Sequence, residues 1–174
     1  LINGEIIKTE PRKAEPQVRV VHVLDGAASL DVYLDGEAVA QDVAFRAATD
    51  FAPWREGEYE LAIFEAGADP DSADPLLVQP VTIERGKAYS LTATGRIGAP
   101  GARLVAAAHT LDFSSKKDGL RLVAVNALPD RPWVDVRDEV YDEVLVGALA
   151  YGEAREFELS KGTRSVALYT TGSQ

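Results

Sequence analysis

Apolar residues recur with a period of two in short runs along the chain from Val18 onward. In the first run, Val18, Val20 and Leu24 fall on one side of the chain. Side chains of a β-strand alternate between its two faces, so each run predicts a strand. Similar runs cover residues 30–35, 57–64, 76–83, 88–93 and 104–109. Turn sequences such as Asp35-Gly36 separate them at intervals of roughly 8–12 residues, which predicts an all-β fold of the sandwich kind. Residues 43–51 leave room for a short helical turn.

The second part of the chain repeats the pattern of the first. Residues 18–21 match 120–123, residues 30–32 match 134–136, residues 57–64 match 162–169, and Phe45 and Phe51 match Tyr151 and Phe157. A repeat of about a hundred residues indicates duplicated domains. We therefore predict two tandem immunoglobulin-like antiparallel β-sandwich domains, residues 18–111 and a shorter domain at 120–174. Residues 1–17 form an N-terminal arm and linker, and the polar stretch 112–119 joins the domains.

The second copy is shorter by about three strands and is predicted to be incomplete. A half-built sandwich exposes unpaired backbone groups and an uncovered apolar face. Three sources of cover remain open: the first domain of the same chain, a strand from another molecule, or further chain beyond residue 174. A smaller second domain that is stable without such cover is a further alternative. The arm residues Leu1, Ile2, Ile6 and Ile7 are suited to the second of these, which would link subunits head to tail.

Composition narrows the function classes. The formal charge is −10, from 18 Lys and Arg against 28 Asp and Glu, which argues against nucleic-acid binding. No stretch approaches the roughly 20 apolar residues of a membrane-spanning helix. The chain has no cysteine and two histidines, so thiol chemistry is excluded and histidine chemistry has little material. No enzyme activity and no cofactor are predicted. The absence of methionine, with Leu1 first, predicts a processed product or a fragment.

A few residues are candidates for binding. Asp69, Asp71 and Asp74 place three carboxylates in one short loop, which makes a weak calcium site conceivable beside the simpler interpretation of a solvated turn. Trp54 and Trp133 each follow a proline and could contact a sugar or a partner, or cap the core. A second acidic stretch at 135–143 is interpreted as a solvated face. His22 is predicted to be a hydrogen-bonded core histidine.

Several segments of the first copy resemble the DUF4397 family of bacterial and archaeal proteins. These segments are residues 18–22, 31–36, 49–51, 57–61 and 84–91, together with Phe45. The resemblance covers residues 18–110 well and residues 120–172 weakly, and the second copy has Ala124 where the first has His22. It implies an exported or lipid-anchored β-sandwich module, often in tandem, without an established activity.

The sequence therefore predicts a non-catalytic structural or interaction protein that is extracellular, at the cell surface or periplasmic. In the first hypothesis it self-associates, as a surface or filament subunit that assembles by β-strand complementation through its arm. In the alternative hypothesis it is a carbohydrate-binding or cell-wall-binding module that uses Trp54 or Trp133, with a cell-surface polymer as its partner.

Overall fold

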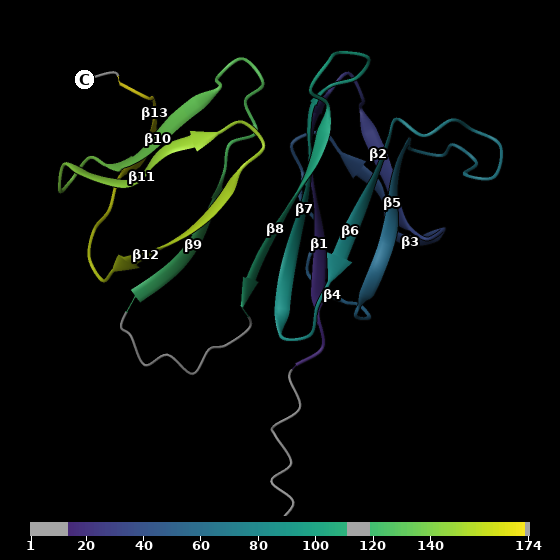
Figure 1. Cartoon of the computed structure of the whole chain (residues 1–174), viewed down its shortest axis with the longest axis horizontal. Coiled ribbons are helices and arrows are strands. Elements are labelled where there is room, and N and C mark those ends of the chain that lie inside the picture. Colours follow the sequence, from purple (N-terminus) through teal and green to yellow (C-terminus); the bar gives the residue numbers. More distant parts are fainter. Residues whose placement is uncertain (1–13, 111–118, 173–174) are drawn as a thin grey trace, which may run out of the picture.

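The computed structural model describes residues 14–110 and 119–172, and every regular element in these two stretches is a β-strand. The strands are β1 (Gln17–Asp25), β2 (Ser29–Leu34), β3 (Glu37–Ala44), β4 (Ala52–Pro53), β5 (Gly57–Glu65), β6 (Leu77–Ile83), β7 (Lys87–Arg96), β8 (Arg103–Thr110), β9 (Gly119–Val125), β10 (Trp133–Asp138), β11 (Glu143–Ala150), β12 (Ala154–Ser160) and β13 (Val166–Thr170). The prediction of an all-β sandwich is confirmed (Figure 1). No helical turn forms over residues 43–51, where Ala48 instead makes an isolated bridge to Val21.

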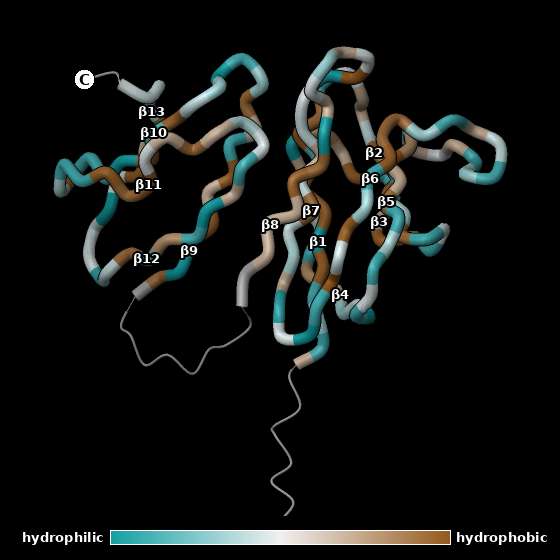
Figure 2. Tube along the Cα trace, in the orientation of Figure 1, coloured by the Kyte–Doolittle hydropathy of each residue, from teal (hydrophilic) through white to brown (hydrophobic). Residues whose placement is uncertain are grey.

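Strands β1–β8 form a two-layered sandwich, called the first module below. One sheet has the order β4-β1-β7-β8 and the other β3-β2-β5-β6. Every second residue of β1 is buried between them, so the predicted face of Val18, Val20 and Leu24 lies in the core. Figure 2 shows the hydrophobic stretches of β1, β5 and β7 that run through this module. The strand order of the first sheet depends on a long-range contact, because β1 pairs with β7 in parallel from Gln17 and Ala88 onward.

The hairpin between β2 and β3 forms at the predicted turn. Asp35 and Gly36 have φ values of 47° and 79°. Two consecutive positive φ angles are what a two-residue type I′ hairpin requires, and Asp-Gly is among the sequences that tolerate them. The carboxylate of Asp35 also accepts the N–H of Glu60 at 2.7 Å, which fixes the turn against β5.

Strands β9–β13 form a smaller two-layered unit, called the second module below. Its sheets have the orders β11-β10-β13 and β12-β9. Between them lies a small core of Val134, Val136, Val146 and Leu149, which Ala124, Leu145 and Phe157 extend. With fewer strands in each layer, this module buries far less apolar surface than the first.

The two modules share a β-bulge, held by a buried aspartate, in the middle strand pair of one sheet. β10 lies between β11 and β13 as β2 lies between β3 and β5. In both hairpins the register shifts at a buried aspartate, Asp31 or Asp135, whose carboxylate accepts a backbone N–H at 2.7 Å from Asp42 or at 2.8 Å from Ala148. Both donor residues have positive φ, 50° and 48°. These shared bulges agree with the predicted repeat, while the immunoglobulin-like and tandem assignments stay predictions.

The second module packs beside β8 on the side away from the first core. Leu104 of β8 faces the core, so its neighbour Val105 points outward, yet Val105 is 5% exposed. On this side β8 contacts β9 and β12. The Thr94 hydroxyl donates to the carbonyl of Ala127 at 2.8 Å, and the Tyr151 hydroxyl donates to the carbonyl of Gly101 at 2.7 Å. These hydrogen bonds join the two modules, which lie side by side in Figure 1.

Candidate functional site

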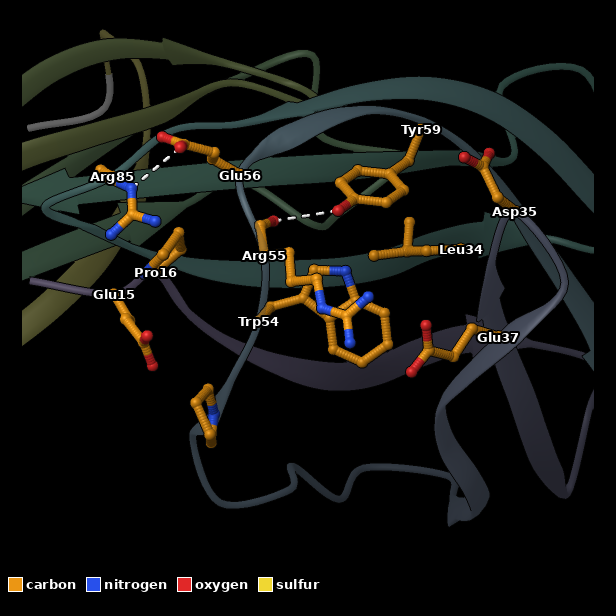
Figure 3. Close-up of a pocket in the computed structure, with 11 residues that line it drawn as sticks. Glu15, Pro16, Leu34, Asp35, Glu37, Trp54, Arg55, Glu56, Tyr59 and Arg85 are labelled. Atoms are coloured by element: carbon orange, nitrogen blue, oxygen red, sulfur yellow. Dashed lines mark hydrogen bonds and ion pairs between the residues drawn. The ribbon is translucent and has the colours of Figure 1, made fainter.

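Two surfaces stand out among the described residues, and the first is a cleft at one end of the first module, called the Trp54 cleft below. It has a volume of about 750 Å³. The chain before β1, the β2–β3 turn, the segment after β4 and the start of β5 all contribute to it. Its lining is Glu15, Pro16, Leu34, Asp35, Glu37, Pro53, Trp54, Arg55, Glu56, Tyr59 and Arg85 (Figure 3).

Trp54 is held in the wall of this cleft by backbone and core contacts. Its N–H donates to the carbonyl of Pro16 at 2.9 Å, and its partly buried side chain packs against the core of the first module. The Tyr59 hydroxyl donates to the carbonyl of Arg55 at 3.1 Å, which steadies the segment that follows Trp54. A tryptophan anchored in this way can offer an aromatic surface to a ligand without a large loss of side-chain entropy.

The charged side chains of the cleft differ in their contacts and exposure. Arg85 donates to Glu56 at 2.9 Å, and this hydrogen bond raises the pKa of Arg85. In Figure 3, Glu15 and Arg85 lie on one side of Trp54, and Asp35 and Glu37 on the other. Glu15 and Glu37 are exposed. The cleft therefore presents carboxylate acceptors, together with the exposed Arg55, around an aromatic ring.

The second surface consists of apolar side chains of the second module that point inward but stay uncovered. Leu168 pairs with the buried Val136, and Leu120 lies on the same face of β9 as Ala124, which contacts the small core. Yet Leu120 is 59% exposed, Val166 44% and Leu168 60%. We call these three residues the open face.

The first module shows what the open face lacks. In the repeat, Leu120, Val166 and Leu168 match Val18, Leu61 and Ile63, which are 1%, 0% and 0% exposed. There the sheet of β1, β7 and β8 covers β5, whereas in the second module β9 has β12 alone as a strand neighbour among the described residues. The contact with the first module, one of the three sources of cover considered above, therefore leaves the open face exposed.

In the second module, the end that matches the Trp54 cleft in the repeat contains a buried ion pair. A groove of about 530 Å³ is lined by Leu120, Leu159, Ser160, Lys161, Gly162 and Arg164. The guanidinium of Arg164 donates to the fully buried carboxylate of Asp138 at 2.7 Å. Burial works to raise the pKa of Asp138, but the hydrogen bonds from Arg164 and from the N–H of Val140 outweigh it and lower that pKa. The interpretation of residues 135–143 as a solvated face is wrong at Asp138, which is fully buried, so sequence reasoning does not find this pair.

The remaining sequence candidates are not brought together. The oxygens of Asp69 accept the Asp71 N–H at 3.1 Å and the Ser72 hydroxyl at 2.9 Å, which caps their own turn. Within residues 14–110 and 119–172, no group of three or more carboxylates or histidines could hold a metal ion, so the calcium prediction gains no geometric support. Trp133 is 51% exposed at the start of β10, in a different module from Trp54.

Three further predictions concern the N-terminal arm, His22 and membrane-spanning segments. The arm residues Leu1, Ile2, Ile6 and Ile7 lie outside the described residues. His22 is fully buried, with Nδ1 accepting the N–H of Leu24 and Nε2 contacting the carbonyl of Ala27, both at 3.2 Å, as expected of a core histidine. The part of the chain that is described contains no helix capable of crossing a membrane.

The fold and these surfaces define the class of the molecule as a β-sandwich protein whose second module leaves apolar side chains exposed. It belongs to the family described as "Domain of unknown function (DUF4397)", which matches residues 16–137. The resemblance predicted from the sequence is thereby confirmed, and the match continues beyond the first module through most of β10. A comparison with curated proteins finds no match.

Proposed function

We propose that the protein is a non-catalytic structural or interaction protein, located outside the cytoplasm, that self-associates through the open face of its second module. The observation that carries this proposal is the contrast between exposed Leu168 and its buried counterpart Ile63. Fully burying one Val or Leu side chain is worth roughly 1.5–3 kcal/mol. Cover for the open face would therefore be worth several such contributions.

The occupant that we propose is residues 1–7 of a second copy. This segment is mostly apolar, through Leu1, Ile2, Ile6 and Ile7. Asn3 and Glu5 are its polar residues. A segment of this kind can add to a sheet edge as an extra strand, with main-chain hydrogen bonds for affinity and side-chain pockets for specificity. Because donor and acceptor lie at different places on the chain, each copy can give and receive, which generates an open chain of subunits.

The test measures the size of the particle formed by the full chain, by size exclusion and negative-stain microscopy. Deletion of residues 1–10 should leave a monomer with an intact first module, and a synthetic peptide of residues 1–10 should bind to that monomer. A strictly monomeric full chain at high concentration, or polymer that survives the deletion, would contradict the proposal.

A matched pair of surface variants separates the open face from general surface change. Leu168→Glu should abolish assembly, since it places a charge where an apolar strand would be buried. Val78→Glu is the control, because Val78 is also an exposed strand residue, at 46%, but lies on β6 of the first module. Equal effects of the two variants would count against the open face.

The non-catalytic part of the proposal is supported by the residues present. The chain has no cysteine and two histidines, and His22 is buried with both ring nitrogens in contact with the backbone. The extracytoplasmic part follows from the resemblance to exported proteins, and cell fractionation tests it. Recovery of the protein in the cytoplasmic fraction would refute that part alone.

A second candidate function is carbohydrate binding at the Trp54 cleft. The aromatic ring of Trp54 beside Glu37 and Asp35 favours it, since sugars stack their C–H faces on aromatic rings and donate hydroxyl protons to carboxylates. Binding to soluble cell-wall oligosaccharides should be lost in Trp54→Ala and weakened about tenfold in Glu37→Gln, whereas Trp133→Ala should retain it. Binding that survives in Trp54→Ala, or no binding to any glycan tested, would exclude this function.

A further inference from the structure

The free edge of β9 has a direct counterpart inside the same molecule. In the first module, β1 has β4 on one side and β7 on the other, and the β7 neighbour runs parallel to it over nine residue pairs from Gln17 with Ala88 to Asp25 with Arg96. In the second module, β9 matches β1 and is paired with β12 on one side, with no described strand hydrogen-bonded to its other edge. The vacant position is therefore that of β7.

The side chains of β7 show what fills this position. Tyr89, Leu91 and Ala93 face the core of the first module and are 4%, 0% and 0% exposed. They stand opposite Val18, Val20 and His22. The matching positions of β9 are Leu120, Leu122 and Ala124. The unpaired edge of β9 is therefore suited to a strand with apolar residues at every second position.

We propose that residues 1–7 of a second copy add to β9 as a strand parallel to it, with Ile2, Gly4 and Ile6 opposite Leu120, Leu122 and Ala124. This inference rests on the proposed function and specifies the direction and register of the donor. The inward residues of such a strand would lie over Val166 and Leu168 of β13, as the sheet of β7 lies over Leu61 and Ile63 in the first module.

A disulfide-trapping experiment reads the direction, because the natural chain contains no cysteine. The donor carries Asn3→Cys together with Leu168→Glu, which blocks its own open face. The acceptor lacks residues 1–10 and carries either Arg121→Cys, near the start of β9, or Val125→Cys, at its end. Each donor–acceptor mixture is first analysed under reducing conditions by size exclusion, and the disulfide-linked product is then measured after oxidation.

In the parallel register Asn3 lies opposite Arg121, so the Arg121→Cys acceptor should give at least tenfold more linked product than the Val125→Cys acceptor. A preference for Val125→Cys, or equal yields, with the reduced complex still present would overturn the parallel direction while leaving residues 1–7 as the donor. Failure of the reduced proteins to form any complex would overturn the donor itself, and the proposed register with it.

Discussion

At the residue scale, His22 shows how burial and hydrogen bonding fix a protonation state. Because the N–H of Leu24 donates to Nδ1, the proton of the neutral ring resides on Nε2, which donates it to the carbonyl of Ala27. Protonation would place a second N–H against that of Leu24. Burial lowers the pKa of His22, and the bond to Ala27 opposes this only in part.

This lowered pKa predicts a pH dependence of stability. Between the ordinary histidine value near 6.5 and the lower folded value, the unfolded chain binds a proton that the folded chain does not. The free energy of unfolding should therefore fall as pH decreases through this window, by at most about 1.4 kcal/mol per pH unit. Urea titrations from pH 7.5 to 5 should show this slope in the natural chain and in His109→Gln. They should show it reduced in His22→Gln, and equal slopes in all three would contradict the assignment.

Ala148 carries local backbone strain in the bulge of β11. Its φ of 48° lies in the left-handed region, where a Cβ is disfavoured, and its N–H is bonded to Asp135. Ala148 is exposed, so Ala148→Gly loses no packing. We expect it to raise the free energy of unfolding by up to about 1 kcal/mol. Ala150→Gly, at an ordinary strand position, should lower it by about 0.5–1 kcal/mol. Denaturation followed by tryptophan fluorescence distinguishes these outcomes, and a loss in both variants would refute the strain argument.

At the element scale, β13 and β5 match in the repeat, but the inward side chains of β5 are buried whereas those of β13 are exposed. Deleting a buried side chain removes its transfer free energy and leaves a cavity, whereas deleting an exposed one does neither. Ile63→Ala should therefore destabilise the protein by about 2–5 kcal/mol, and Leu168→Ala by less than about 1 kcal/mol in the monomer. Thermal unfolding at low protein concentration measures both. A large loss in Leu168→Ala would mean that the open face is covered within a single chain.

The same scale shows what the sequence could and could not predict. Alternation was sufficient for strands such as β1, because a strand buried on one face shows its period directly. The match of Asp31 with Asp135 pointed to the repeated hairpin. The parallel pairing of β1 with β7 was not predictable, since it joins residues about seventy positions apart without a local pattern. The ion pair of Asp138 with Arg164 was not predictable either, because the cluster of acidic residues around Asp138 favours a solvated face and hides its burial.

At the scale of the whole molecule, the question is whether the two modules fold as one unit. The second module has a small core and an uncovered face, so little of its stability arises within it. Its contacts with the first module include the Tyr151 hydroxyl on the Gly101 carbonyl and the Arg103 guanidinium 4.6 Å from the centre of the Tyr151 ring. These bonds connect the weaker module to the stronger one.

We therefore predict that Tyr151→Leu uncouples the modules. Losing both the hydrogen bond and the ring contact removes stabilisation that the second module takes from the first, on the order of 1–2 kcal/mol. Differential scanning calorimetry of the Tyr151→Leu monomer should show the second module melting first, in a separate transition. Tyr169→Phe is the matched control, because its hydroxyl bonds to Glu139 at 2.8 Å within the second module; it should shift melting without splitting the transition. A single transition in Tyr151→Leu would contradict this prediction and would show that other contacts, such as the hydrogen bond from the Thr94 hydroxyl to the Ala127 carbonyl, couple the modules.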